Sequence, residues 1–249
     1  HRNIYNAAGS RAAGNLRTIN VQVTFSGSNP RAEEFLRAKS ARMVSEITNE
    51  QLVTLQRKLH DAMQRGINPR KAAREIVNTV GLTERQMRAV ANYRRLLEQG
   101  SSAALDRALR DANMDALVRR GNLSPAQIDR MVEAYQRNYL RYRTEMIART
   151  EMLSAANHAV HEAYEQATDA GDLDPEQYVR QWLTAADERV RGTHRSMHRQ
   201  VRPKGEPFVT GSGYRAMYPH DPSLPARERV HCRCIVATRF RAIVETENK

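Results

Sequence analysis

The sequence predicts a mainly α-helical protein: a helical N-terminal part leads, through one long helix, into a small α+β C-terminal module. Up to Ala167, apolar residues recur at helical spacing, and glycine and proline are scarce. Beyond Thr168, glycine and proline become frequent, and short apolar segments replace the helical pattern. The change at this point predicts a loop-rich module after the helices.

The first 30 residues are rich in Gly, Asn and Ser and contain an alternating run at 18–25. Such alternation is typical of one short strand. Because the run has no strand partner nearby, we predict an extended arm over 1–30 that pairs with another element. An ordinary surface loop is the alternative interpretation.

Residues 31–143 form the predicted helical region. Helices are expected over 30–66, 69–77, 83–99 and 103–118, separated by glycine-containing breaks. Pro69 suits the first turn of its helix. Thr83 followed three residues later by Gln86 has the form of a capping box.

The longest predicted helix begins after Ser124 and continues to about Ala167. Ser124 caps it, Pro125 takes its first position and Gln127 completes a second capping box. Its apolar face includes several tyrosines, such as Tyr135 and Tyr139. We interpret this face as core packing rather than as a surface for stacking bases.

The C-terminal module, 144–240, is predicted to contain two short strands, at 181–184 and 234–238, with Trp182 anchoring a small core. Residues 241–249 are predicted to be a tail.

Charge is divided unevenly between the two parts. The net charge of the chain is +12, and all of the excess lies in residues 1–143, whereas residues 144–249 are neutral overall. Only five of the 40 basic residues are lysine. Because arginine binds phosphate and carboxylate in a planar, bidentate manner, the helical region is suited to nucleic acid or to an acidic protein surface. A solvated helical surface with spare charge is the simpler alternative.

Other features of the sequence indicate the compartment in which we expect the protein. The only cysteines, Cys232 and Cys234, have a spacing poorly suited to a disulfide, which fits a reducing compartment. No segment approaches the length of apolar sequence needed for a transmembrane helix, and the polar start resembles no signal peptide. Since the chain begins at His1, we expect further residues to precede it in the natural protein.

Four residues form a candidate zinc site. On a helix, His194 and His198 would face the same side, and Cys232 and Cys234 would supply two thiolates. His231 is a substitute ligand. A small module with little core would gain stability from a bound metal, but buried free cysteines are also common as simple apolar residues.

Charged residues of the module are predicted to form structural ion pairs that dock it on the long helix, rather than a catalytic site. Since Arg233 lies between two cysteines on a probable strand, its side chain should point opposite to theirs and reach an acidic group. The set consists of Arg149, Glu151, Asp187, Arg189 and Arg233.

Taken in order, several of these segments resemble the Mu F-like phage head-morphogenesis, or minor capsid, family. The matching segments are 147–151 with Asn157 and Ala163, Trp182 with 187–191 and His194, 219–223, and 231–235. The chain departs from the family pattern at His231, where relatives often have Asn. Arg191 and His194 also stand where many relatives have a Cys-x-x-Cys pair.

The resemblance implies a minor structural protein of a phage head rather than an enzyme. It would act in head morphogenesis and DNA packaging, in the virion and, during assembly, in the host cytoplasm. Its implied partners are the portal protein and the major capsid protein, with double-stranded DNA as a third candidate and no membrane. No catalytic residue and no cofactor other than the candidate zinc are implied.

Two other functions remain as alternatives. The histidines together with Asp187 invite a metal-dependent hydrolase, such as a nuclease, although the chain contains no recognisable nuclease pattern. A free-standing nucleic-acid-binding protein is the second alternative. Its binding would weaken steeply with salt.

Overall fold

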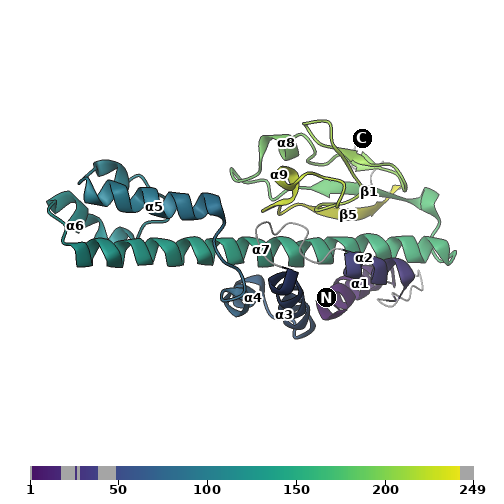
Figure 1. Ribbon diagram of the computed structural model, residues 1–249. Helices are drawn as coiled ribbons and strands as arrows, with labels where there is room; N and C mark the ends of the chain where they lie inside the picture. The colour runs from purple at the N-terminus through teal and green to yellow at the C-terminus, as the bar shows by residue number, and fades with distance from the viewer. Residues whose placement is uncertain (1, 18–25, 27–28, 39–48, 242–249) are drawn as a thin grey trace.

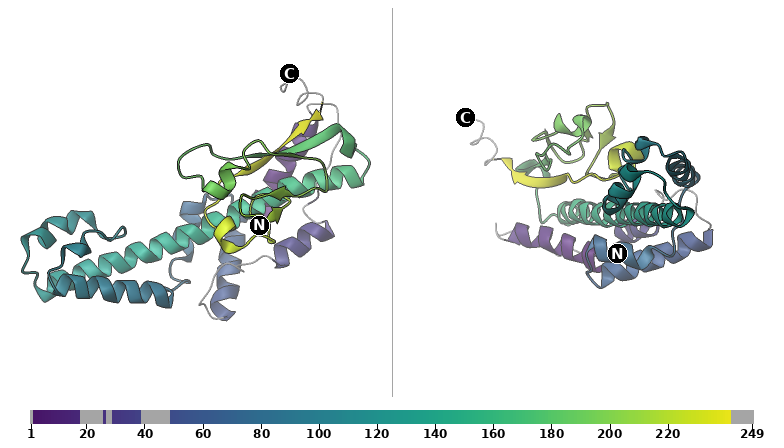
Figure 2. Two further views of the ribbon diagram at one scale, coloured as in Figure 1. Left: turned by 90° about the horizontal axis from the view of Figure 1, so that it is seen from above. Right: turned by 90° about the vertical axis from the view of Figure 1, so that its left-hand side faces the viewer.

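In the computed structural model, which describes residues 2–17, 26, 29–38 and 49–241, one long helix forms a central spine. This helix, α7 (Pro125–Asp169), carries the C-terminal β module on one side and helices α1 to α4 on the opposite side (Figure 1). Helices α5 and α6 pack along its N-terminal half. The end-on view in Figure 2 shows the same layered arrangement. The predicted mainly α fold with a small strand-containing module is confirmed.

The predicted start of α7 is also confirmed. The Ser124 hydroxyl accepts a hydrogen bond from the Gln127 N–H, the Gln127 side chain bonds back to the Ser124 N–H, and Pro125 occupies the first turn. With 45 residues, α7 is roughly 65–70 Å long. A helix of this length is stabilised by packing along its whole surface rather than by intrinsic propensity.

The remaining helices surround this spine. They are α1 (Arg2–Arg17), α2 (Pro30–Ala38), α3 (Asn49–Gln64), α4 (Pro69–Ile76), α5 (Glu84–Glu98) and α6 (Asp115–Arg120), with short 3₁₀ turns η1 (Ser102–Ala104) and η2 (Ala112–Met114). The predicted capping box of α5 is present, with Thr83 and Gln86 bonded reciprocally. Asn68 caps α4, which has Pro69 in its first turn as expected.

Separate apolar clusters hold these helices on α7. Leu55, Leu59 and Ile76 of α3 and α4 pack against Ile147 and Met152. Farther toward the N-terminus of α7, Tyr93 of α5 packs on Tyr135, with ring centroids 4.3 Å apart, and Tyr139 contacts Tyr135 edge-on. Tyr135 and Tyr139 are therefore core packing, as predicted, whereas Tyr142 of the same predicted face is 45% exposed.

The expectation of an extended arm over 1–30 is wrong for its first half, because residues 2–17 form helix α1. Glycines 9 and 14 lower the intrinsic helix propensity of this segment. Its stability comes instead from tertiary contacts: Ala12 and Ala13 pack beside Ala163 and Ala167 of α7, and Tyr5 is fully buried. The alternating run at 18–25 lies outside the described residues, as do 39–48, the middle of the predicted 30–66 helix, and 242–249, nearly all of the predicted tail.

The single helix predicted over 103–118 is replaced by η1, η2 and the short α6. The Ser101 hydroxyl accepts from the Ala103 N–H, and the Asp111 carboxylate accepts from the Asn113 N–H. Such local bonds between side chain and backbone compete with a continuous helix.

The β module contains a three-stranded antiparallel sheet in the order β2-β1-β5 and a small β3-β4 hairpin. Its elements are η3 (Pro175–Gln177), β1 (Tyr178–Leu183), α8 (Gly192–Arg195), β2 (Val201–Arg202), β3 (Phe208–Val209), β4 (Arg215–Ala216), α9 (Ala226–Arg229) and β5 (Ile235–Phe240). The two predicted strands, now β1 and β5, pair along their whole length, with Trp182 opposite Val236. Trp182 is fully buried at the centre of the module core, as expected.

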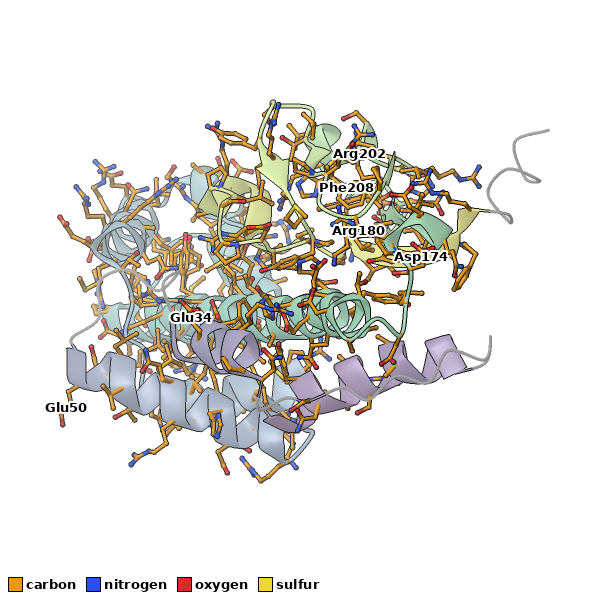
Figure 3. All side chains as sticks on the ribbon, turned by 90° about the vertical axis from the view of Figure 1, so that its right-hand side faces the viewer. Glu34, Glu50, Asp174, Arg180, Arg202 and Phe208 are labelled. Carbon is orange, nitrogen blue, oxygen red and sulfur yellow. The ribbon has the colours of Figure 1, made fainter. Side chains whose placement is uncertain are left out.

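A buried arginine connects the sheet to the loops around it. Arg180 of β1 donates hydrogen bonds to the carbonyls of Met217 (2.8 Å), Pro203 (3.0 Å) and Glu206. Its guanidinium lies over the Phe208 ring, 5.3 Å from the centroid. Figure 3 shows Arg180, Phe208 and Arg202 gathered within the module. Desolvation lowers the Arg180 pKa from its ordinary value, and the nearby Glu165 partly opposes this effect.

Candidate functional site

Three metal-ligating side chains meet inside the β module. His194 lies on α8, while Cys232 and Cys234 lie between α9 and β5. The His194 Nδ1 atom is 3.6 Å from the Cys232 sulfur and 3.5 Å from the Cys234 sulfur. All three ligand atoms lie within 4.8 Å of one another, and each side chain is buried.

Backbone geometry places both sulfur atoms on one side of the chain. Cys232 and Cys234 are buried, whereas Arg233 between them points the other way, as the alternation of an extended segment requires. Arg191, just before α8, donates to the carbonyls of Glu228 and Val230. This contact ties the His194 turn to the segment that carries the cysteines.

A buried carboxylate, that of Glu228, lies next to the Nε2 atom of His194. The His194 Nε2 atom is 2.9 Å from the Glu228 Oε2 atom. The other contacts of this carboxylate come from the hydroxyls of Thr193 (2.9 Å) and Ser212 (2.8 Å). Burial alone would raise the Glu228 pKa, but the two hydroxyl bonds and the neighbouring His194 and Arg191 bring it below its ordinary value. An ionised Glu228 favours a proton on Nε2, which leaves the Nδ1 lone pair facing the sulfur atoms.

The two thiols differ in acidity. The hydrogen bond from Cys234 outweighs burial and lowers the Cys232 pKa to about 4. The same hydrogen bond and burial raise the Cys234 pKa.

A cavity of about 20 Å³ adjoins the cluster. It is lined by the three cluster residues and by Ala185, Arg189, Val190, Arg191, His231 and Arg233. A cavity of this size holds about one water molecule. It has no room for a peptide or a nucleotide.

His198, the fourth predicted ligand, does not join the cluster. Helix α8 has only four residues and ends at Arg195, so the predicted same-side arrangement of His194 and His198 does not arise. His198 is exposed, and its Nδ1 atom lies 3.2 Å from the Thr184 N–H nitrogen and 3.0 Å from the Thr184 hydroxyl. The substitute ligand His231 lines the cavity, and its Nε2 atom lies 3.3 Å from the Tyr142 hydroxyl.

The predicted ion-pair residues are distributed differently from the expected docking set. Arg233 binds Asp187 in a bidentate manner, at 2.5 and 2.6 Å, and the hydrogen bonds from Arg233 lower the Asp187 pKa. This pair lies within the module. Arg189 and its neighbour Glu188, 3.7 Å apart, are both largely exposed. On α7, Arg149 is exposed and Glu151 is buried.

Neutral groups contribute to the docking of the module on α7. The Ser154 hydroxyl donates to the His220 carbonyl (3.2 Å), and the Tyr218 ring packs on His161 with centroids 4.9 Å apart. Charged contacts add to these: Lys204 lies 3.6 Å from Glu165 and 3.7 Å from Asp169, both on α7.

The arginine-rich part carries two grooves along α7. One groove, of about 530 Å³, lies between α4 and α7 and is lined by Arg70, Ala73, Arg74, Val77, Arg141, Thr144 and Glu145. The other, of about 460 Å³, lies beside η2 and is lined by Arg110, Asp111, Ala112, Asn113, Ala134, Arg137, Asn138 and Arg141. Arg141 belongs to both, so the two grooves adjoin. We call them together the arginine grooves.

Sequence reasoning did not find Glu228 or these grooves. Glu228 meets His194 across 34 residues of chain, and no local spacing signals such a contact. The grooves depend on how α4 and η2 pack on α7. None of the described helices combines the length and apolar character needed to cross a membrane.

Comparison with known proteins assigns the chain to a family. The family model for phage Mu protein F-like proteins matches residues 107–237, more than half of the chain. This match begins within the arginine-rich helical region. The uncharacterized protein YqbB of Bacillus subtilis (strain 168) is 32% identical over 100 residues, which cover 39% of this chain and 30% of that protein. The chain thus matches under a third of the length of this relative, and no solved structure matches it. By the family match, the chain belongs to the phage Mu protein F-like family.

Proposed function

We propose that this protein is a minor structural component of the phage head that binds the portal protein or the major capsid protein through its arginine grooves. The supporting observation is that arginine is concentrated in the N-terminal part of the chain, whereas the C-terminal part has no net charge. All of the +12 net charge lies in residues 1–143, and Arg70, Arg74 and Arg141 are exposed around one groove.

The lining of the grooves favours a protein partner over DNA. Ala73 and Val77 give the first groove an apolar floor, and Glu145 sits among its arginines. Asp111 occupies a similar place in the second groove. Carboxylates repel phosphate, whereas a mixture of apolar surface, arginine and acid is typical of protein interfaces. Acidic side chains on a head protein would pair with the arginines in a bidentate manner.

The test is binding of the full chain to purified portal protein, to purified major capsid protein and to double-stranded DNA. We expect capture by one of the two head proteins, and we expect the double variant Arg74→Glu/Arg141→Glu to weaken it at least about tenfold, because reversed charges at an interface repel the partner. The matched control is Arg215→Glu, which reverses an exposed charge on β4 and should leave binding unchanged.

Salt dependence separates the two classes of partner. Binding that rests on phosphate contacts falls by orders of magnitude between low and moderate salt. Binding to a head protein with an apolar floor should fall much less. The proposal is wrong if neither head protein is captured, or if DNA alone is bound with a steep salt slope.

A further inference from the structure

We propose that His194, Cys232 and Cys234 form a zinc site within the β module, with His194 Nδ1 and the two sulfur atoms as ligands. The site is separate from the arginine grooves and does not depend on the proposed partner.

The distances from His194 Nδ1 to the two sulfur atoms match tetrahedral zinc. With Zn–S bonds of about 2.3 Å and Zn–N bonds of about 2.0–2.1 Å, the sulfur and nitrogen ligands of a tetrahedron lie about 3.6 Å apart. The observed separations from Nδ1 to the two sulfur atoms are 3.6 and 3.5 Å. The ligand atoms are therefore already placed around a position that a Zn²⁺ ion would fill.

The donor set also selects the metal. Two thiolates and one imidazole suit zinc, whereas magnesium and calcium prefer oxygen ligands. The carboxylate of Glu228, 2.9 Å from His194 Nε2, lies where metal-bound histidines commonly have an outer carboxylate partner. The hydroxyls of Thr193 and Ser212 in turn fix Glu228.

The 20 Å³ cavity beside the three side chains, which His231 also lines, would receive the fourth ligand of the ion. This volume admits one water molecule but no organic substrate. The cluster residues are also almost fully buried, with exposed fractions of 2% for His194, 3% for Cys232 and 4% for Cys234. A reactive cysteine needs partial exposure. The arrangement therefore fits a structural metal better than a thiol nucleophile paired with histidine.

The metal would connect parts of the module that are distant in sequence. His194 belongs to α8, and the cysteines precede β5, so one ion would hold these segments beneath Trp182, whose ring meets His194 edge-on at 5.9 Å. A module with two short paired sheets and many loops gains stability from such a link.

The first test uses the wild-type chain. After removal of metal with a chelator and reconstitution with Zn²⁺ alone, we expect about one zinc per chain by mass spectrometry of metals. With Co²⁺ alone, we expect the charge-transfer absorption of cobalt–thiolate bonds and the strong visible bands of tetrahedral cobalt. A chain that takes up well under one zinc, or a cobalt spectrum without thiolate bands, would overturn the proposal whether or not any variant folds.

Variants then assign the ligands. His194→Ala, Cys232→Ser and Cys234→Ser should each lose the bound metal, whereas the matched control His198→Ala should keep it. Glu228→Gln should retain the stoichiometry at saturating Zn²⁺ but weaken affinity about 10–100-fold, while Glu188→Gln, which changes an exposed acid, should not. Equal loss of metal in His198→Ala and His194→Ala would contradict the assignment.

Discussion

Replacement of Arg180 by methionine is expected to destabilise the β module by about 3–5 kcal/mol, because three backbone carbonyls lose their hydrogen-bond donor. The guanidinium is 3% exposed and donates to three backbone carbonyls, those of Pro203, Glu206 and Met217. Methionine fills a similar volume but leaves these carbonyls without their donor, and each unsatisfied buried group costs about 1–3 kcal/mol.

Urea unfolding followed by tryptophan fluorescence measures the stability of the β module itself. Trp182 is the only tryptophan of the chain and lies at the centre of the module core. The matched control is Arg215→Met, an exposed arginine of the same module, which should change stability by less than about 0.5 kcal/mol. A loss below about 1 kcal/mol in Arg180→Met would show that water replaces the guanidinium, and that the loops do not depend on it.

Replacement of Trp182 by alanine should cost about 3–5 kcal/mol through lost burial and the cavity that remains. The indole is fully buried, with edge-on contacts to Phe208 at 5.3 Å and to His194 at 5.9 Å. Because the His194 ring loses its edge-on contact with the indole, we also expect the variant to bind zinc more weakly.

Calorimetry of thermal unfolding suits this variant, since it removes the fluorescent reporter. Trp182→Phe is the control: it keeps an aromatic ring in the core and should lose clearly less stability than alanine. If the phenylalanine and alanine variants were equally unstable, the ring contacts would not be the cause.

The chain's local signals predicted its helix starts well. Ser124, Thr83 and Pro69 act through neighbours within three residues, so their effects are visible in the sequence itself. The pairing of the two C-terminal strands follows from their alternation and from the apolar segment around Trp182.

Features set by distant contacts were not predictable in the same way. Helix α1 forms because its alanines fit the small residues of α7, at a separation of about 150 residues along the chain. Similarly, Glu228 acquires its role only when α9 folds against α8. The prediction for His198 failed because a local pattern was extended too far. We expected His198 to share a helix with His194, but α8 ends at Arg195, after one turn.

The docking of the module on α7 includes contacts that the sequence did not indicate. Arg149 and Glu151 on α7 suggested charged docking, and Ser154, His161 and the aromatic Tyr218 make further contacts. Arg233 and Asp187 pair with each other inside the module.

The central claim, that the arginine grooves hold the chain on a head protein, is tested most directly by photo-crosslinking in assembled heads. A photoreactive amino acid at position 74, in the α4 groove, should crosslink to the portal protein or the major capsid protein. The same amino acid at position 215, on the exposed face of β4, should give little or no such product. Heads that lack the chain, or equal crosslinking from both positions, would contradict the account.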